Sequence, residues 1–183
     1  MFDAMACAQK DLNNFFGLNP NEERFLKDVR GISVNKIIEK AAPYIRGILK
    51  HMGEIRLIYD QLEEEPSFYP DFRPSNFITN REGIWVLDFN LPSFGKPSES
   101  FPYFIDNSLF DGQRNKMIQG LCPNINDYHV AAVYVNIYNA YVVKRFNLGE
   151  DNLAYHLRCA AESSAILGKK GLAKTLNDAA GIC

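Results

Sequence analysis

The chain has 183 residues, of which 46% are hydrophobic, 13% aromatic and 23% charged, and its formal net charge is -2. This length and composition exclude intrinsic disorder and indicate one folded domain with a sizeable core. A net charge this close to zero attracts neither nucleic acid nor an anionic membrane, so we expect neither as a partner. No apolar run approaches the ~18 residues of a membrane-spanning helix and no signal peptide is recognisable, so we expect a cytoplasmic protein.

Residues 1–66 are predicted to be helical. Gly17 and Gly31 each follow a short helical pattern and end it. Beyond them, apolar residues from Ile37 to Ile58 recur near helical spacing. Pro43 lies inside this stretch, so the stretch forms either one kinked helix or two helices that meet close to the proline.

Residues 67–100 differ from the rest because they contain two short β-like runs. Phe77–Thr79 and Ile84–Phe89 are β-branched or aromatic, and the turn sequence Asn80-Arg81-Glu82-Gly83 separates them. We therefore expect an antiparallel β-hairpin. Two short strands are only marginally stable alone in water, so this hairpin should lie on the helices.

Residues 101–183 are predicted to be helical again. The longest expected helix follows Asp127, which is the predicted N-cap residue, and Asn147-Leu148-Gly149 ends it. Two further helices are expected at residues 151–167 and 169–180.

Three polar residues lie at the ends of the predicted hairpin. Asp71 precedes the first strand, Asn76 opens it, and Asp88 lies near the end of the second. An antiparallel hairpin brings the start of its first strand beside the end of its second, so Asn76 and Asp88 should be neighbours. An amide oxygen and a carboxylate suit Mg²⁺, which takes one or two protein oxygens together with phosphate and water.

The sequence of this stretch resembles the catalytic-loop motif of the aminoglycoside phosphotransferase and choline kinase family, which is protein-kinase-like. In that family the catalytic loop has roughly the sequence His-Gly-Asp-Phe-His-Pro-x-Asn, and the following hairpin ends with Ile-Asp-Trp or Leu-Asp-Phe. This chain has Asp71-Phe72-Arg73-Pro74-Ser75-Asn76 and then Leu87-Asp88-Phe89, whereas Tyr69-Pro70 replaces the family's His-Gly. The resemblance covers this stretch closely and the helical surroundings loosely.

The resemblance implies a role for each matched residue. Asp71 would orient or deprotonate the acceptor hydroxyl, and Asn76 and Asp88 would hold Mg²⁺ on the phosphates of ATP. It also implies a fold class: mainly α with a small β-hairpin, the C-terminal lobe of an aminoglycoside phosphotransferase-like fold. The single domain would span residues 1–183, with a catalytic-loop-like hairpin at 67–100 between two helical parts.

The implied function is transfer of the ATP γ-phosphoryl group to a hydroxyl of a small molecule, with Mg²⁺ and ATP as cofactors. The residues before Asp71 show neither the β-sheet, the phosphate-covering loop nor the lysine of the family's N-terminal lobe. Three interpretations stay open: a fragment, one half of a split enzyme, or a lobe that lost catalysis. A homodimer or a partner chain would then cover the surface of the missing lobe.

The alternative function is a non-catalytic helical binding or scaffold module derived from such a lobe and lacking nucleotide turnover. Asp and Asn also favour loop starts and strand ends for reasons of turn chemistry alone. His51, His129 and His156 are predicted to be hydrogen-bonded helix residues rather than metal ligands. A stripe of tyrosines predicts buried core, with the wall of an acceptor pocket as its alternative: Tyr128, Tyr134, Tyr138 and Tyr141.

Overall fold

The computed structural model describes residues 34–63, 65–67, 77–86, 93–107 and 112–181. These residues divide into two compact units. Unit 1 contains the described residues within Glu63–Leu121, and unit 2 contains those within Ile32–Leu62 and Cys122–Cys183. Two compact units are compatible with one domain, so the single domain over residues 1–183 stays a prediction.

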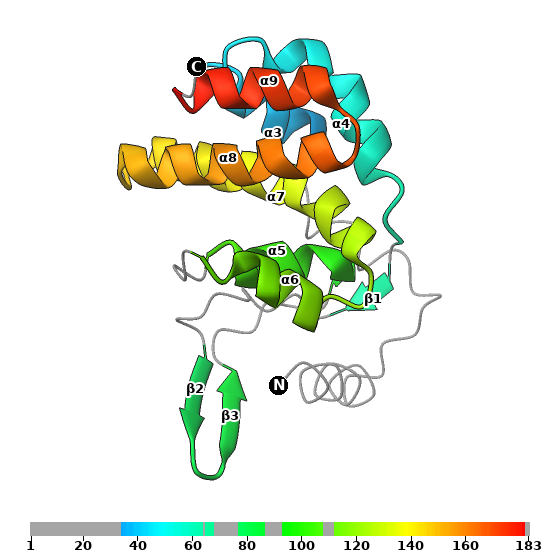
Figure 1. Ribbon diagram of the computed structural model, residues 1–183, viewed down its shortest axis with the longest axis vertical. Helices are drawn as coiled ribbons and strands as arrows, with labels where there is room; N and C mark the ends of the chain where they lie inside the picture. The colour runs from blue at the N-terminus through cyan, green and yellow to red at the C-terminus, as the bar shows by residue number, and fades with distance from the viewer. Residues whose placement is uncertain (1–33, 64, 68–76, 87–92, 108–111, 182–183) are drawn as a thin grey trace. The chain divides into compact units, whose positions relative to one another are not determined.

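The described residues of unit 2 form helices joined by turns, and the mainly helical character predicted from the sequence is confirmed. In Figure 1, α8 lies between α7 and α9. Its helices are α3 (Val34–Ala41), the short 3₁₀ helix η1 (Ile48–His51), α4 (Met52–Tyr59), α7 (Ile125–Arg145), α8 (Glu150–Ile166) and α9 (Lys170–Ala179).

The stretch around Pro43 forms two separate helices rather than one kinked helix. Helix α3 ends at Ala41, two residues before the proline, which cannot donate the next helical hydrogen bond. The chain then turns through Gly47, whose φ of 85° is in the left-handed region that glycine adopts without steric cost. Helix α4 resumes at Met52 after the 3₁₀ turn.

The core of unit 2 is aliphatic and is built where α7 packs against α8, α3 and α4. Burying an isoleucine or leucine side chain stabilises the fold by about 1.5–3 kcal/mol, so this cluster supplies the main driving force for unit 2. Its fully buried large members are Ile38, Ile45, Ile48, Ile55, Val130, Ile137, Leu157, Leu172 and Leu176.

The N-terminus of α7 is capped by Asn124, not by Asp127 as the sequence predicts. The Asn124 side-chain oxygen accepts hydrogen bonds from the backbone N–H groups of Asn126 at 3.0 Å and Asp127 at 3.4 Å. The prediction of Asp127 as the cap is therefore wrong, because the first helical turn already contains it. In that turn the Asp127 carboxylate interacts favourably with the positive end of the helix dipole.

The described residues of unit 1 form two short antiparallel pairings, one 3₁₀ helix and two α-helices. Strand β1 (Glu65–Ser67) pairs with β4 (Ser93–Gly95), and β2 (Phe77–Asn80) pairs with β3 (Gly83–Val86). Pro97–Glu99 forms the 3₁₀ helix η3, and α5 (Ser100–Ile105) and α6 (Arg114–Leu121) follow.

Strand β1 corrects one predicted boundary. The helical part was expected to reach residue 66, but Glu65 and Pro66 belong to β1 and α4 ends at Tyr59. Pro66 has no N–H group to continue a helix, and its fixed φ suits an extended strand at the edge of a sheet.

Candidate functional site

The β2–β3 hairpin has a defined register and a tight turn. Phe77 lies opposite Val86 and Asn80 lies opposite Gly83, so Arg81 and Glu82 form the loop. The Asn80 side-chain oxygen accepts hydrogen bonds from the backbone N–H groups of Glu82 at 2.8 Å and Gly83 at 3.1 Å. This side-chain-to-backbone bonding is what makes asparagine a frequent turn residue.

The three predicted site residues, Asp71, Asn76 and Asp88, lie outside the described residues. In the sequence, the described strands β2 and β3 lie within two residues of Asn76 and Asp88. Phe77, which follows Asn76, is paired with Val86, which stands two residues before Asp88.

The β1–β4 pairing encloses the whole segment that carries the three predicted residues. Ser67 lies directly opposite Ser93, so the two described residues that flank the segment 68–92 are held side by side. The β2–β3 pairing lies between these two strands in the sequence. This nesting of one pairing within another was not predicted from the sequence.

One face of the hairpin carries two exposed apolar side chains. Ile78 and Trp85 lie directly opposite each other, and 49% and 55% of their surfaces are exposed. Directly opposed residues on an antiparallel pair point to the same face and lie within contact distance. The hairpin therefore presents a small exposed apolar face.

Helices α5 and α6 of unit 1 are joined by a buried ion pair. The Arg114 Nε atom donates to Asp106 Oδ1 at 2.8 Å, and the Asp106 side chain is fully buried. Lys96 and Glu99 are also buried in this unit. Removing one partner of a buried pair typically costs about 3–5 kcal/mol, so we interpret Asp106 and Arg114 as residues that hold the unit together.

His51 joins three segments of unit 2. Its Nδ1 atom lies 3.1 Å from Glu54 Oε2, and its Nε2 atom lies 3.0 Å from Thr175 Oγ1 on α9. The carboxylate only accepts, so Nδ1 carries a proton. Lys169 Nζ lies 3.9 Å from the other Glu54 oxygen. A hydroxyl, an imidazole and a carboxylate in series resemble a nucleophile relay, but Thr175 is 94% buried (6% exposed), which closes its hydroxyl to a substrate.

The other two histidines lie buried between α7 and α8. His129 Nδ1 is 3.2 Å from Ser163 Oγ, and His156 Nδ1 is 2.8 Å from Asn136 Oδ1. The Asn136 amide nitrogen donates to the Ala132 carbonyl at 3.0 Å, which leaves its oxygen to accept from His156. The prediction of hydrogen-bonded helix histidines is thus confirmed for all three.

The tyrosine stripe divides into one buried and three half-buried residues. Tyr128 is fully buried, as predicted, whereas the remaining members are partly exposed. The ring of Tyr59, from α4, contacts the ring of Tyr134 in a tilted arrangement, with centroids 4.6 Å apart. The half-buried members are Tyr134, Tyr138 and Tyr141.

The contact between His51 and Thr175 is the feature that sequence reasoning missed. The two residues are 124 positions apart, so no local pattern relates them. The His51–Glu54 spacing of three was readable as a helical neighbour pair, because residues three apart share a face.

Within the part of the chain that the structure describes, no three or more His, Cys, Asp or Glu side chains gather as a metal site would require. Among the same residues, no helix has the length and apolar character needed to cross a bilayer. No protein-family model, no curated protein and no solved structure matches this chain.

Proposed function

We propose that this chain is the C-terminal lobe of an aminoglycoside/choline-kinase-like phosphotransferase, which transfers the ATP γ-phosphoryl group to a hydroxyl of a small molecule. The observation that carries the proposal is the pairing of Phe77 with Val86. In the sequence, Asn76 directly precedes the first of these two strands and Asp88 follows Val86 by two residues. The proposal needs this arrangement, because both residues must reach one Mg²⁺ ion.

The donor set fits magnesium. One carboxylate and one amide oxygen leave room for phosphate and water oxygens around the ion, as Mg²⁺ sites in such enzymes require. When bound, Mg²⁺ would neutralise charge on the transferred phosphoryl group. Asp88 and Asn76 would position it, and Asp71 would direct the acceptor oxygen, so catalysis would rest on positioning and electrostatics.

The nucleotide-phosphate contacts that this family takes from an N-terminal lobe would have to come from a further polypeptide segment. We therefore separate metal-nucleotide binding, which the proposal assigns to this chain, from phosphoryl transfer, which it assigns to the complete enzyme. The first can be measured on the chain alone.

The test is the thermal unfolding of the chain with Mg²⁺ and ATP together and with each alone. A ligand at 100 times its Kd stabilises the folded state by about 2.7 kcal/mol, so we expect a raised Tm only with both present. Asp88→Ala and Asn76→Ala should abolish this rise, whereas Asp71→Ala should keep it. Glu82→Gln, which changes an exposed carboxylate in the turn of the same hairpin, is the matched control and should behave as the parent.

A second candidate is the non-catalytic binding module, which the exposed Ile78–Trp85 face favours. Under this function the Tm does not respond to Mg²⁺ and ATP, and Asp88→Ala is at least as stable as the parent. That pair of results would overturn the phosphotransferase proposal.

A further inference from the structure

The connection between α7 and α8 in unit 2 is a rigid corner. The Leu148 N–H donates to the Val143 carbonyl at 2.9 Å, and the Asn147 N–H donates to the Lys144 carbonyl at 3.3 Å. Together with the left-handed φ of 54° at Asn147, these two bonds make a Schellman motif. The Leu148 carbonyl in turn accepts from the Asn152 side chain at 2.7 Å. The corner backbone is therefore preorganised.

Two large apolar side chains are exposed at this corner. Phe146 and Leu148 expose 61% and 53% of their surfaces, although they are only two residues apart. A Schellman motif commonly places an apolar residue at the Leu148 position, where it contacts the last turn of the helix. It does not require an exposed phenylalanine before it.

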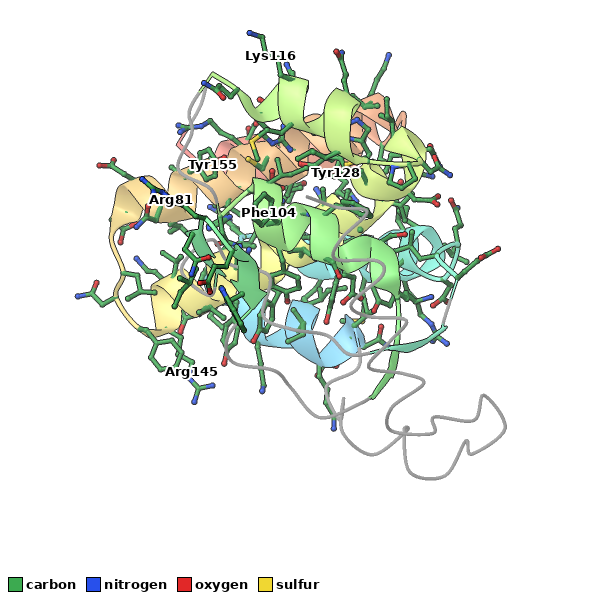
Figure 2. The ribbon with its side chains drawn as sticks, turned by 90° about the horizontal axis from the view of Figure 1, so that it is seen from below. Arg81, Phe104, Lys116, Tyr128, Arg145 and Tyr155 are labelled. Carbon is green, nitrogen blue, oxygen red and sulfur yellow. The ribbon has the colours of Figure 1, made fainter. Side chains whose placement is uncertain are left out.

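Two cations converge on the aromatic rings beside them. The Arg145 guanidinium lies 5.3 Å from the Phe146 ring and 5.9 Å from the Tyr141 ring, and its Nη1 atom donates to the Tyr141 hydroxyl at 2.8 Å. Lys40, from α3, places its Nζ atom 5.9 Å from the same Tyr141 ring. Figure 2 shows the Arg145 side chain extending away from the ribbon at the edge of the view.

Arg145 and Lys40 differ from the neighbouring Lys144 because no described carboxylate forms an ion pair with them. Lys144 is paired with Glu150 at 2.5 Å, but neither Arg145 nor Lys40 forms an ion pair with any acid that the structure describes. The negative end of the α7 dipole accounts for a basic residue in its last turn. It does not account for Lys40 on another helix or for the exposed Phe146.

We propose that this corner surface, formed by Lys40, Tyr141, Arg145, Phe146 and Leu148, binds an acidic protein segment that carries an apolar side chain. Arginine and aromatic residues on a rigid backbone are the residue types that dominate binding energies at protein interfaces. The free edge of the Arg145 guanidinium offers a two-point contact to a carboxylate. Phe146 and Leu148 offer the adjoining apolar contact.

A protein segment fits this surface better than a membrane or a nucleic acid does. Glu150 and Asp151 begin α8 next to the corner and would face any broad anionic surface laid on it. A narrow segment can place its acid over Arg145 and Lys40 and its apolar side chain over Phe146 while avoiding both acids. This surface shares no residue with the proposed phosphotransferase site.

The test is fluorescence anisotropy with a labelled peptide of alternating glutamate and leucine. Two matched peptides replace the glutamates by lysine or the leucines by serine. We expect saturable binding of the first peptide, about tenfold tighter than of either matched peptide, because both the charged and the apolar contacts are needed. Arg145→Glu and Phe146→Ser should each weaken it about tenfold, since each removes a central contact.

The control is Lys170→Glu, which makes the same charge reversal at an exposed position on α9 and should leave binding unchanged. Lys40→Glu is a second charge variant on a different helix, and circular dichroism confirms that each variant is folded. The proposal is overturned if the parent binds the peptide no more tightly than Arg145→Glu does, or if Lys170→Glu is equally impaired. It is also overturned if phosphatidylserine vesicles or single-stranded DNA, but not the peptide, bind in a manner that depends on Arg145 and Phe146.

Discussion

His51 shows how one side chain can join distant parts of the chain. Its Nδ1 atom donates to Glu54, and its Nε2 atom is hydrogen-bonded to the Thr175 hydroxyl of α9. Gly171, one turn before Thr175, lies so close to the ring that an added Cβ would stand 3.4 Å from His51 Cε1. The imidazole is therefore clamped between a hydroxyl, a carboxylate and the backbone of α9.

We expect Thr175→Val to destabilise the fold by about 1–3 kcal/mol, since the substitution keeps the side-chain shape but leaves a part-buried ring nitrogen without its partner. Thr175→Ser keeps the hydroxyl and should lose less. Urea unfolding followed by circular dichroism measures both. Equal midpoints for the two variants would show that the hydrogen bond contributes nothing.

At the scale of elements, the packing of α7 on α8 is specified by two polar pairs. His129–Ser163 and Asn136–His156 each cross the seam, and on both helices the paired positions are seven residues apart. Three alanines of these helices, Ala132, Ala140 and Ala160, are also buried. Apolar packing alone would tolerate a shift of the helices, whereas displaced polar pairs would lose their partners.

A double-mutant cycle tests this account of the seam. Asn136→Leu should cost about 1–3 kcal/mol because it leaves a His156 donor buried without that acceptor. The double variant Asn136→Leu/His156→Leu should recover part of this loss, because replacing both partners removes the unmet donor. Free energies of unfolding from urea titrations give the coupling. Strict additivity of the two single changes would contradict a direct Asn136–His156 interaction.

The N-cap of α7 can be tested by mutation, because the structure assigns it to Asn124 whereas the sequence pattern assigns it to Asp127. Asn124→Ala should destabilise the protein by about 1 kcal/mol, the usual cost of removing an N-cap side chain. Asp127→Asn removes only a charge near the helix dipole and should cost about 0.3–1 kcal/mol, decreasing with added salt. Thermal unfolding at low and high salt measures both. A larger effect at Asp127 than at Asn124 would restore the sequence-based assignment.

Elements with strong local signals were predictable from the sequence. Helices α8 and α9 begin and end within one residue of their predicted bounds, because Gly149 and Gly168 interrupt an otherwise regular apolar spacing. Strands β1 and β4 were not, since three-residue strands containing Pro66 and Gly95 carry no alternating pattern. Their pairing depends on contacts between segments 28 positions apart, from Ser93–Gly95 back to Glu65–Ser67.

The turn of the hairpin was predictable from the sequence, whereas the His51–Thr175 contact was not. The turn residues Asn80 and Gly83 indicate where the hairpin reverses, and the observed register is centred on them. The contribution of Asp71, Asn76 and Asp88 rests on the family resemblance and stays a prediction. The His51–Thr175 contact had no sequence signal, because it is created only when α9 packs on η1.

At the scale of the whole molecule, the order of the units along the chain determines which contacts must form between distant residues. The described residues of unit 1 lie between two segments of unit 2, so unit 2 must bring α3 and α4 to α7 across a long intervening stretch. Contacts between residues so far apart are entropically costly to form and slow to fold. The aliphatic cluster of unit 2 nevertheless takes every one of its members from unit 2 itself.

We therefore expect unit 2 to fold when residues 63–121 are replaced by a flexible glycine-serine linker. Its core cluster stays complete in this variant, and the cost of closing a loop grows only slowly with length, by about 0.6 kcal/mol for each doubling. Cooperative thermal unfolding of a helical circular dichroism signal is the expected result, in variants with either a short or a long linker. The variants lack Asp71, Asn76 and Asp88, so Mg²⁺ and ATP should no longer raise their Tm. If neither linker gives a cooperative transition, unit 2 needs the middle of the chain to complete its fold, and the aliphatic cluster is insufficient to drive folding alone.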